Sequence, residues 1–142
     1  MAMPRVEIEL PERFAFSTEL EVRVSDLNYG NHVGNDQVLS LIHEARRRYI
    51  RSLGADEIGA DGMGFVIADA AVVYRAQAFY GNSLKVQVAA GEFQSRSCAF
   101  FYKVSKGDTV VAEARTGVVC FDFKAQKAVS FPPALLQGLQ RS

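Results

Sequence analysis

The chain has 142 residues, of which 49% are apolar and 23% are charged. This balance is typical of a folded globular protein and excludes an extended disordered chain. Its 16 lysines and arginines equal its 16 aspartates and glutamates, so no overall positive charge favours nucleic acid as a partner. We expect a single domain over residues 1–142, long enough to bury a core.

The N-terminal part of the chain combines polar and alternating segments. The sequence MAMPRVEIELPER is too polar for a signal peptide. Residues 5–10 and 16–24 are predicted to be extended, with Pro11 and a short polar stretch between them. The connection that follows, SDLNYGNHVGN over residues 25–35, holds three amides, two glycines, a histidine and an aspartate. An ordinary loop needs only one or two such residues, so this one is a candidate for function.

A long helix is predicted from about Asn35 to Leu53. Apolar residues recur there every three or four positions, as on one face of a helix: Val38, Leu41, Ile42, Ala45, Tyr49 and Leu53. Asn35 is a favourable N-cap, Asp36 suits the positive first turn, and Gly54 follows the last turn.

The second half of the chain is rich in strand-forming residues. Strands are predicted over 64–76, 83–93, 97–105 and 109–123. Turn signals separate them, and no segment between them could form a crossover helix, so successive strands are expected to be antiparallel neighbours. Pro132-Pro133 ends the last strand, and residues 134–139 are predicted to form a terminal helical turn. The expected fold class is α+β, with the long helix wrapped by a curved antiparallel sheet of about five strands. Its exposed edge strands favour association with a second copy.

The two cysteines and the absence of long apolar runs indicate a cellular location. Cys98 and Cys120 lie in strand-like segments and lack the spacing of metal ligands. No apolar run approaches the roughly 18 residues that a membrane span requires. We therefore expect a cytoplasmic protein with reduced, buried cysteines, without a metal site and without a membrane partner.

The segment VRVSDLNYGNHVGNDQVLSLIHEARRRYIRSLG resembles the signature of hotdog-fold acyl thioesterases of the 4-hydroxybenzoyl-CoA thioesterase type. That signature runs Asp-x-Asp, Gly-His-Val-Asn-Asn, and then a helix that carries Glu-Ala-Arg and ends in Leu-Gly. The stretch VVYRAQAFYGNSLKVQV and the late FDF and FPP resemble later parts of the family pattern. The resemblance covers roughly residues 17–133. It implies a hotdog fold, dimers or tetramers with a site at the subunit interface, and an acyl thioester of coenzyme A or acyl carrier protein as substrate, with no further cofactor.

Hydrolysis of a thioester would explain the unusual loop. Unpaired backbone amides at a helix start carry the positive end of the helix dipole and can polarise a carbonyl, so the amides of Asn35 and Asp36 are candidates. Gly34, like Gly30, would let the backbone approach the substrate without a side chain in the way. His32 could hydrogen-bond the thioester or relay a proton near neutral pH.

The sequence departs from the family pattern at Gly34, where an asparagine is expected, at Val38, where a tyrosine is expected, and at Asn28. The second aspartate of Asp-x-Asp, the carboxylate that the resemblance implies for attack or water activation, is Asn28 here. A neutral amide can hold a water or a carbonyl, but it cannot act as a base or nucleophile. The carboxylates that could replace it are Asp26, Asp36, Glu44 and Asp69.

Each candidate also has a simpler structural role that the sequence leaves open. His32 could satisfy the loop backbone, Asp26 could bond loop amides, and Asp36 could offset the helix dipole. Glu44 could pair with Arg47 or Arg48, and Asp69 with Arg75 across an interface. The run Arg46-Arg47-Arg48 could be a solvated helix face, or Arg47 and its neighbours could contact phosphates of coenzyme A or an acidic carrier protein.

Two other functions compete with thioester hydrolysis. Hotdog enoyl-CoA hydratases carry Asp-x-Asn-Pro-x-His, which Asp26, Asn28 and His32 partly match, but here the proline is absent and the histidine comes one residue late. A non-catalytic acyl-thioester binder is the third possibility, favoured by Asn28.

Overall fold

The computed structural model describes residues 3, 5–59 and 61–141. Its strands are β1 (Phe16–Glu21), β2 (Met63–Tyr74), β3 (Ser83–Gly91), β4 (Ser97–Lys106), β5 (Thr109–Asp122) and β6 (Lys127–Ala128). Its helices are the short 3-10 turn η1 (Val24–Asp26), the long α1 (Asn35–Ser52) and the terminal α2 (Pro133–Arg141).

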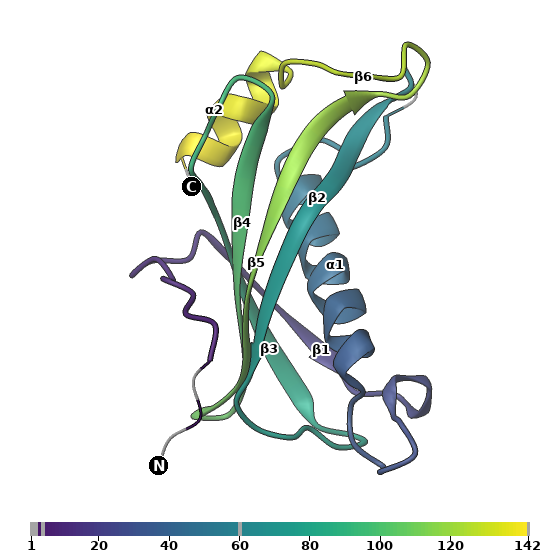
Figure 1. The fold of residues 1–142 in the computed structure, drawn as a ribbon, viewed down its shortest axis with the longest axis vertical. Helices are drawn as coiled ribbons and strands as arrows, with labels where there is room; N and C mark the ends of the chain where they lie inside the picture. Colours follow the sequence, from purple (N-terminus) through teal and green to yellow (C-terminus); the bar gives the residue numbers. More distant parts are fainter. Residues whose placement is uncertain (1–2, 4, 60, 142) are drawn as a thin grey trace.

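The strands form one antiparallel sheet in the order β1-β3-β4-β5-β2, with β6 paired to β5 (Figure 1). Helix α1 crosses the inner face of this sheet and packs most closely on β1 and β3. At the other end of the strand order, the inner face of β5 and β2 is therefore less covered by α1. The predicted α+β architecture, one long helix against one antiparallel sheet, is confirmed.

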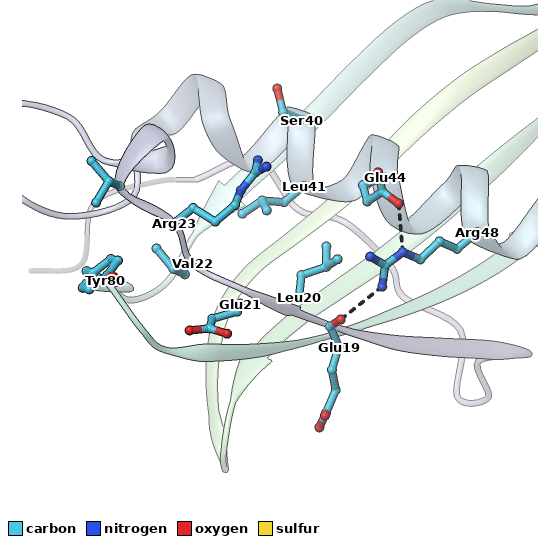
Figure 2. Close-up of a pocket in the computed structure, with 11 residues that line it drawn as sticks. Glu19, Leu20, Glu21, Val22, Arg23, Ser40, Leu41, Glu44, Arg48 and Tyr80 are labelled. Atoms are coloured by element: carbon cyan, nitrogen blue, oxygen red, sulfur yellow. Dashed lines mark hydrogen bonds and ion pairs between the residues drawn. The ribbon is translucent and has the colours of Figure 1, made fainter.

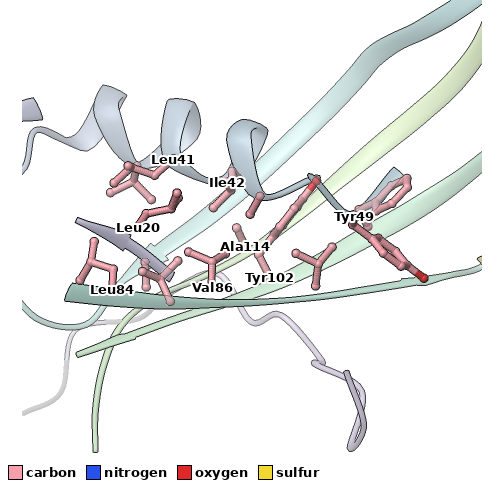
Figure 3. Close-up of a cluster of buried hydrophobic side chains, with 14 of the residues drawn as sticks. Leu20, Leu41, Ile42, Tyr49, Leu84, Val86, Tyr102 and Ala114 are labelled. Carbon is pink, nitrogen blue, oxygen red and sulfur yellow. The ribbon is translucent and has the colours of Figure 1, made fainter. Parts of the chain in front are cut away.

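Alternating side chains of the sheet meet the apolar face of α1 in a single core (Figure 3). Ile42 and Tyr49 of α1 are almost fully buried, as are Val86 of β3 and Tyr102 of β4. The Tyr49 ring lies over the ring of Phe16, with 5.3 Å between centroids. The apolar residues that repeat every three to four positions in α1 and every second position in the strands thus pack in the same core.

Two expectations about the strands were wrong. Residues 5–10 form no strand, because within the described part of the chain their backbone has no neighbouring strand to pair with. Strand β2 does not pair with β3, which follows it in the sequence, but with β5. The reason lies in the connection over residues 75–82, which pairs with the loop before α1: Val33 N donates to Ala78 O at 2.9 Å.

The predicted N-cap of α1 was wrong by one residue. Gly34 is the N-cap, with an extended backbone (φ −69°, ψ 151°), and Asn35 is the first helical residue. Gly34 also accepts the amide hydrogens of Gln37 and Val38 on its carbonyl oxygen. The predicted end is confirmed, since Gly54 follows the last turn with φ +83°, a conformation that glycine adopts without strain.

Both cysteines are buried and free, as predicted. Burial raises the pKa of Cys98 from 9.0 to about 12, with a smaller contribution from Cys120, and burial also raises the pKa of Cys120. Within the described residues, no helix combines the length and the apolar composition that a membrane crossing requires.

We predict that neither thiol of the native protein reacts rapidly with DTNB at pH 8, and that two react after denaturation. At a pH well below its pKa, a thiol is almost entirely protonated, and only the thiolate is the nucleophile. Because the pKa of Cys98 is higher in the folded than in the unfolded chain, its contribution to stability is lost as pH rises above 9. Fast reaction of a folded sample at pH 8 would contradict this. A slow background would also allow DTNB to follow thiol release from a substrate.

Candidate active site

The loop before α1 folds back on itself and presents its backbone to the helix start. Leu27 and Val33 form an antiparallel bridge, and Asn28 N donates to His32 O at 2.9 Å. Asn31 has a positive φ of 61° at the tip, a conformation that asparagine tolerates better than most residues. Gly34 N donates to Asp26 O, so the end of the loop is tied to its beginning.

The first amides of α1 are available to a ligand. Within the described residues, no acceptor meets the amide hydrogen of Asn35 or Asp36. The hydroxyl of Tyr74, from the end of β2, donates to Asn35 O at 2.9 Å. Partial burial and the nearby Asp36 carboxylate raise the pKa of Tyr74, so this hydroxyl keeps its proton. The helix start is therefore held in place on its carbonyl side and left open on its amide side.

A cavity of about 280 Å³ opens beside Asn35 at the helix start. Its wall includes His32 and Asn35 from the loop and helix start, Val38 from the first turns of α1, Tyr74 from β2 and Val111 from β5. Elements far apart in the sequence thus meet around one concave space that both apolar and polar side chains line. This composition is typical of a small-molecule site.

His32 is half-buried, and its ring is oriented by the loop. Its Nδ1 lies 3.1 Å from Val33 O, so a neutral ring with the proton on Nδ1 donates there and leaves Nε2 as an acceptor. Gly30 lies close to that nitrogen: a side-chain carbon on Gly30 would come within 3.1 Å of His32 Nε2 and 3.3 Å of Asn28 Oδ1. The glycine thus allows the His32 and Asn28 side chains to lie near each other.

The acidic loop residues have different surroundings. Asp26 is buried, and its carboxylate accepts the Arg23 amide hydrogen at 2.8 Å and pairs with the Arg23 guanidinium at 3.3 Å. Asp26 therefore stabilises η1, the simpler role that the sequence left open. Asp36 is exposed in the first turn of α1, where its carboxylate interacts favourably with the helix dipole and lies close to the cavity that Tyr74 lines.

A larger cavity, about 580 Å³, lies between α1 and β1 (Figure 2). It contains the predicted substrate residue Glu44, which pairs with Arg48 at 2.8 Å; Arg48 also donates to Glu19 O. Three glutamates line this groove, and its two arginines are already paired with carboxylates. A groove of this charge does not favour an anionic thioester. Arg47 is exposed on α1, apart from the amides of the helix start.

Asp69 lies away from the other candidates, on the outer face of the sheet. Its carboxylate accepts the Gly117 amide hydrogen at 2.9 Å and pairs with Arg115 at 3.3 Å. The expected partner, Arg75, instead pairs with Glu113. A register shift between Ile67 and Asp69 explains the orientation, because one extra residue in a strand reverses which face the next side chain occupies.

The interpretation of Arg46 as part of a solvated helix face was wrong. Arg46 is 4% exposed; its Nε pairs with Glu57 and its Nη1 donates to the Tyr102 hydroxyl at 3.0 Å. Burial opposes the charged form, but Tyr102 and Glu57 outweigh it, so the pKa of Arg46 lies above its ordinary value. The sequence held one signal for this: Arg46 is four residues after Ile42 and four before Ile50, on the apolar face of the helix.

The family pattern matches almost the whole of this architecture. A family model described as the thioesterase-like superfamily matches residues 22–139. The chain belongs to the thioesterase-like superfamily. The family resemblance drawn from the loop and helix is confirmed, as is the expected enzyme class, a thioester hydrolase.

Several members and solved structures are similar to this thioesterase-like chain. The long-chain acyl-CoA thioesterase FadM of Escherichia coli (strain K12) is 25% identical over 127 residues, which cover 87% of this chain and 96% of FadM. A hypothetical protein, AQ1494, from Aquifex aeolicus superposes with a TM-score of 0.82 at 25% identity, covering 87% of this chain and 98% of that one. A 1,4-dihydroxy-2-naphthoyl-CoA thioesterase from Synechocystis has a TM-score of 0.81 at 21% identity, with coverage of 88% and 95%. The predicted hotdog fold is confirmed.

Proposed function

We propose that this protein hydrolyses acyl-CoA thioesters at the start of α1. The single observation that carries the proposal is the pair of amides of Asn35 and Asp36, which have no acceptor among the described residues, at a helix start whose Asn35 lines a cavity together with His32. The relatives that are named as acyl-CoA thioesterases support coenzyme A as the carrier. Acyl carrier protein is the alternative carrier.

The proposed chemistry uses groups of this chain only. The thioester oxygen accepts hydrogen bonds from the two free amides, which stabilise the negative charge that develops on it. A water attacks the carbonyl carbon while His32 Nε2 takes its proton. The C–S bond then breaks, and the imidazolium returns the proton to the sulfur, giving a free acid and a thiol. Asn28 helps to position this water, because its side chain lies near His32 Nε2, and it takes no proton.

Alanine substitutions of Asp26, His32 and Asp36 show which of these side chains acts as the base. Asp26→Ala removes a buried partner of Arg23 and should act through folding of the loop. His32→Ala and Asp36→Ala alter a half-buried and an exposed side chain and should leave the fold intact. Loss of turnover in His32→Ala with normal activity in Asp36→Ala supports histidine as the base; the reverse assigns that role to Asp36.

The experiment that tests the function measures thiol release from acetyl-, decanoyl- and benzoyl-CoA and from a decanoyl carrier protein. We expect release from at least one acyl-CoA that depends on His32. Hydration of crotonyl-CoA without thiol release would instead indicate a hydratase. Binding of acyl-CoA without either reaction would indicate a non-catalytic binder, the outcome that Asn28 favours.

We also propose that β2 pairs with β2 of a second copy, which places the site next to a subunit interface. Strand β2 is the last strand of the sheet on its side, and its middle, residues 66–70, is exposed. Val66 and Ile67 are exposed apolar residues of this strand, and Asp69 is its one charged residue. Such a long apolar edge favours pairing with another strand.

Light scattering tests the association. We expect the wild type to be a dimer or a tetramer, and Val66→Lys to shift it toward the monomer because lysine on an edge strand opposes pairing. Val66→Thr, which keeps the strand propensity and adds no charge, is the matched control and should associate like the wild type. A wild-type monomer at micromolar concentration would contradict the proposed interface.

A further inference from the structure

Arg46 has an unused hydrogen-bond donor although it is buried. Its Nε and Nη1 are taken by Glu57 and Tyr102, and within the described residues no hydrogen bond uses its Nη2. Yet no fully buried side-chain nitrogen or oxygen in this part of the chain lacks a partner. Nη2 must therefore reach accessible space.

Arg46 lines a cavity of about 290 Å³ between α1 and the β2–β5 side of the sheet. Apolar side chains line both walls, Leu39 and Ile42 from α1 and Ile67 and Ala70 from β2, and the α1 wall also carries the polar Ser40 and His43. Thr116, buried on β5, also lines it, and the Thr116 hydroxyl lies 2.8 Å from the Tyr102 hydroxyl. The cavity thus combines apolar side chains from both walls with hydrogen-bonding groups, among them those of Arg46 and Thr116.

This cavity uses the stretches of α1 and β2 that follow those lining the proposed catalytic cavity: Val38 lines the first cavity and Leu39 the second. Along α1, its lining residues run from Leu39 to Arg46, about 6–17 Å from Asn35. Along β2, the four residues from Tyr74 to Ala70 span about 13 Å. An acyl chain whose thioester is bound at Asn35 would reach the Arg46 end of this cavity only if it is of medium length or longer.

The charges around Arg46 define the chemistry of a fitting group. The guanidinium is already balanced by the buried Glu57 carboxylate, and burial raises the pKa of Tyr102, so the phenol stays neutral. A ligand carboxylate would bring an unbalanced charge into a buried site, which is costly. A neutral oxygen acceptor would satisfy Nη2 without that cost.

We propose that this cavity receives the distal part of a medium-length acyl chain, and that Arg46 is a specificity-determining residue that favours chains with a hydroxyl or carbonyl oxygen near the distal end. The inference rests on the proposed acyl-thioester function and extends it to a substrate class. Arg46 contacts the distal oxygen and takes no part in the reaction at the thioester.

Binding of unreactive analogues tests the inference independently of turnover. The probes are thioethers of coenzyme A that carry a decyl, an ω-hydroxydecyl or an ω-carboxydecyl chain, measured by calorimetry. We expect the hydroxylated chain to bind about tenfold more tightly than decyl, the factor that one added hydrogen bond to a charged group gives. The carboxylated chain should bind more weakly than the hydroxylated one.

Two variants assign the preference to this cavity. The double variant Arg46→Gln with Glu57→Gln removes both charges together, so no buried charge remains unpaired, and should reduce the preference for the hydroxyl to about twofold or less. Ala70→Leu fills the cavity from β2 and should weaken binding of decyl and hydroxydecyl probes by about tenfold or more, but not that of an ethyl probe. Its matched control is Ala71→Leu, the next residue, whose side chain lies on the other face of the strand; binding of all three probes should be unchanged.

Equal affinity of the decyl and hydroxydecyl probes for the wild type would overturn the inference. So would a preference that persists in the double variant. Thiol release from decanoyl-CoA, measured in parallel, tests the catalytic proposal separately. Hydrolysis without a preference for the hydroxydecyl probe refutes only the role of Arg46. A preference for that probe without hydrolysis refutes only the catalytic proposal.

Discussion

Replacing Asn35 with proline should lower kcat for acyl-CoA hydrolysis by about 10²–10³, the cost of removing one donor from an oxyanion site. Proline removes the amide hydrogen of Asn35, one of the two that have no acceptor among the described residues. The helix itself should persist, because proline is well tolerated at the first helical position. The preceding Gly34 already has the extended backbone that a residue before proline prefers.

The matched control for this change is Asn35→Ala, which removes the same side chain and keeps the amide hydrogen. Both variants retain the carbonyl that accepts the Tyr74 hydroxyl, so both should show the same thermal midpoint within a few degrees. The difference in kcat between them measures the amide alone. Equal kcat values for the proline and alanine variants, in folded proteins of equal stability, would rule out this amide as a catalytic donor.

The elements that local sequence signals define were predictable. The apolar repeat and Gly54 place α1 within one residue at either end, because these signals act within a few turns of the chain. The same signals put the free amides at Asn35 and Asp36. The cavity beside them was not predictable, since its other wall comes from Tyr74 and Val111, and no local pattern indicates which strand lies opposite a helix start.

Strand order and strand faces depend on long-range contacts that the sequence pattern does not carry. The pairing of β2 with β5 arises because the intervening connection hydrogen-bonds to the loop before α1. Asp69 would share the inner face with Ile67 in a regular strand, since the two are two residues apart. The bulge between them reverses this, so a predicted site residue lies on the outer face.

Arg46 was missed because a run of three arginines is usually exposed, and because its partner comes from an irregular segment. Glu57 is held there by backbone contacts: its carbonyl accepts the Phe65 amide hydrogen at 2.9 Å. Gly64 permits this approach, since a side-chain carbon on it would lie 2.6 Å from Glu57 O. The Arg46–Glu57 pair therefore depends on Gly64 and on the turn that holds Glu57. Their contacts form only in the folded chain, so no local sequence pattern predicts them.

That dependence leads to a large expected effect on stability. Arg46→Ala should lower the free energy of unfolding by about 3–5 kcal/mol, because it leaves Glu57 buried without its guanidinium partner. Glu57 is 5% exposed, and its remaining contact is with His43, whose side chain is largely exposed. Urea denaturation, followed by circular dichroism, measures the change against a total that is about 5–15 kcal/mol for a domain of this kind.

The double variant Arg46→Met with Glu57→Leu separates the cost of an orphaned charge from the value of the pair. Apolar side chains of similar size should restore most of the stability that Arg46→Ala loses, since replacing a buried ion pair as a whole is often neutral. Arg48→Ala, which breaks the exposed pair with Glu44 on the same helix, is the control and should cost less than about 1 kcal/mol. If Arg46→Ala lowers the free energy of unfolding no more than Arg48→Ala does, water must hydrate the Glu57 carboxylate once the guanidinium is removed. The Arg46–Glu57 pair then does not stabilise the packing of α1 on the sheet.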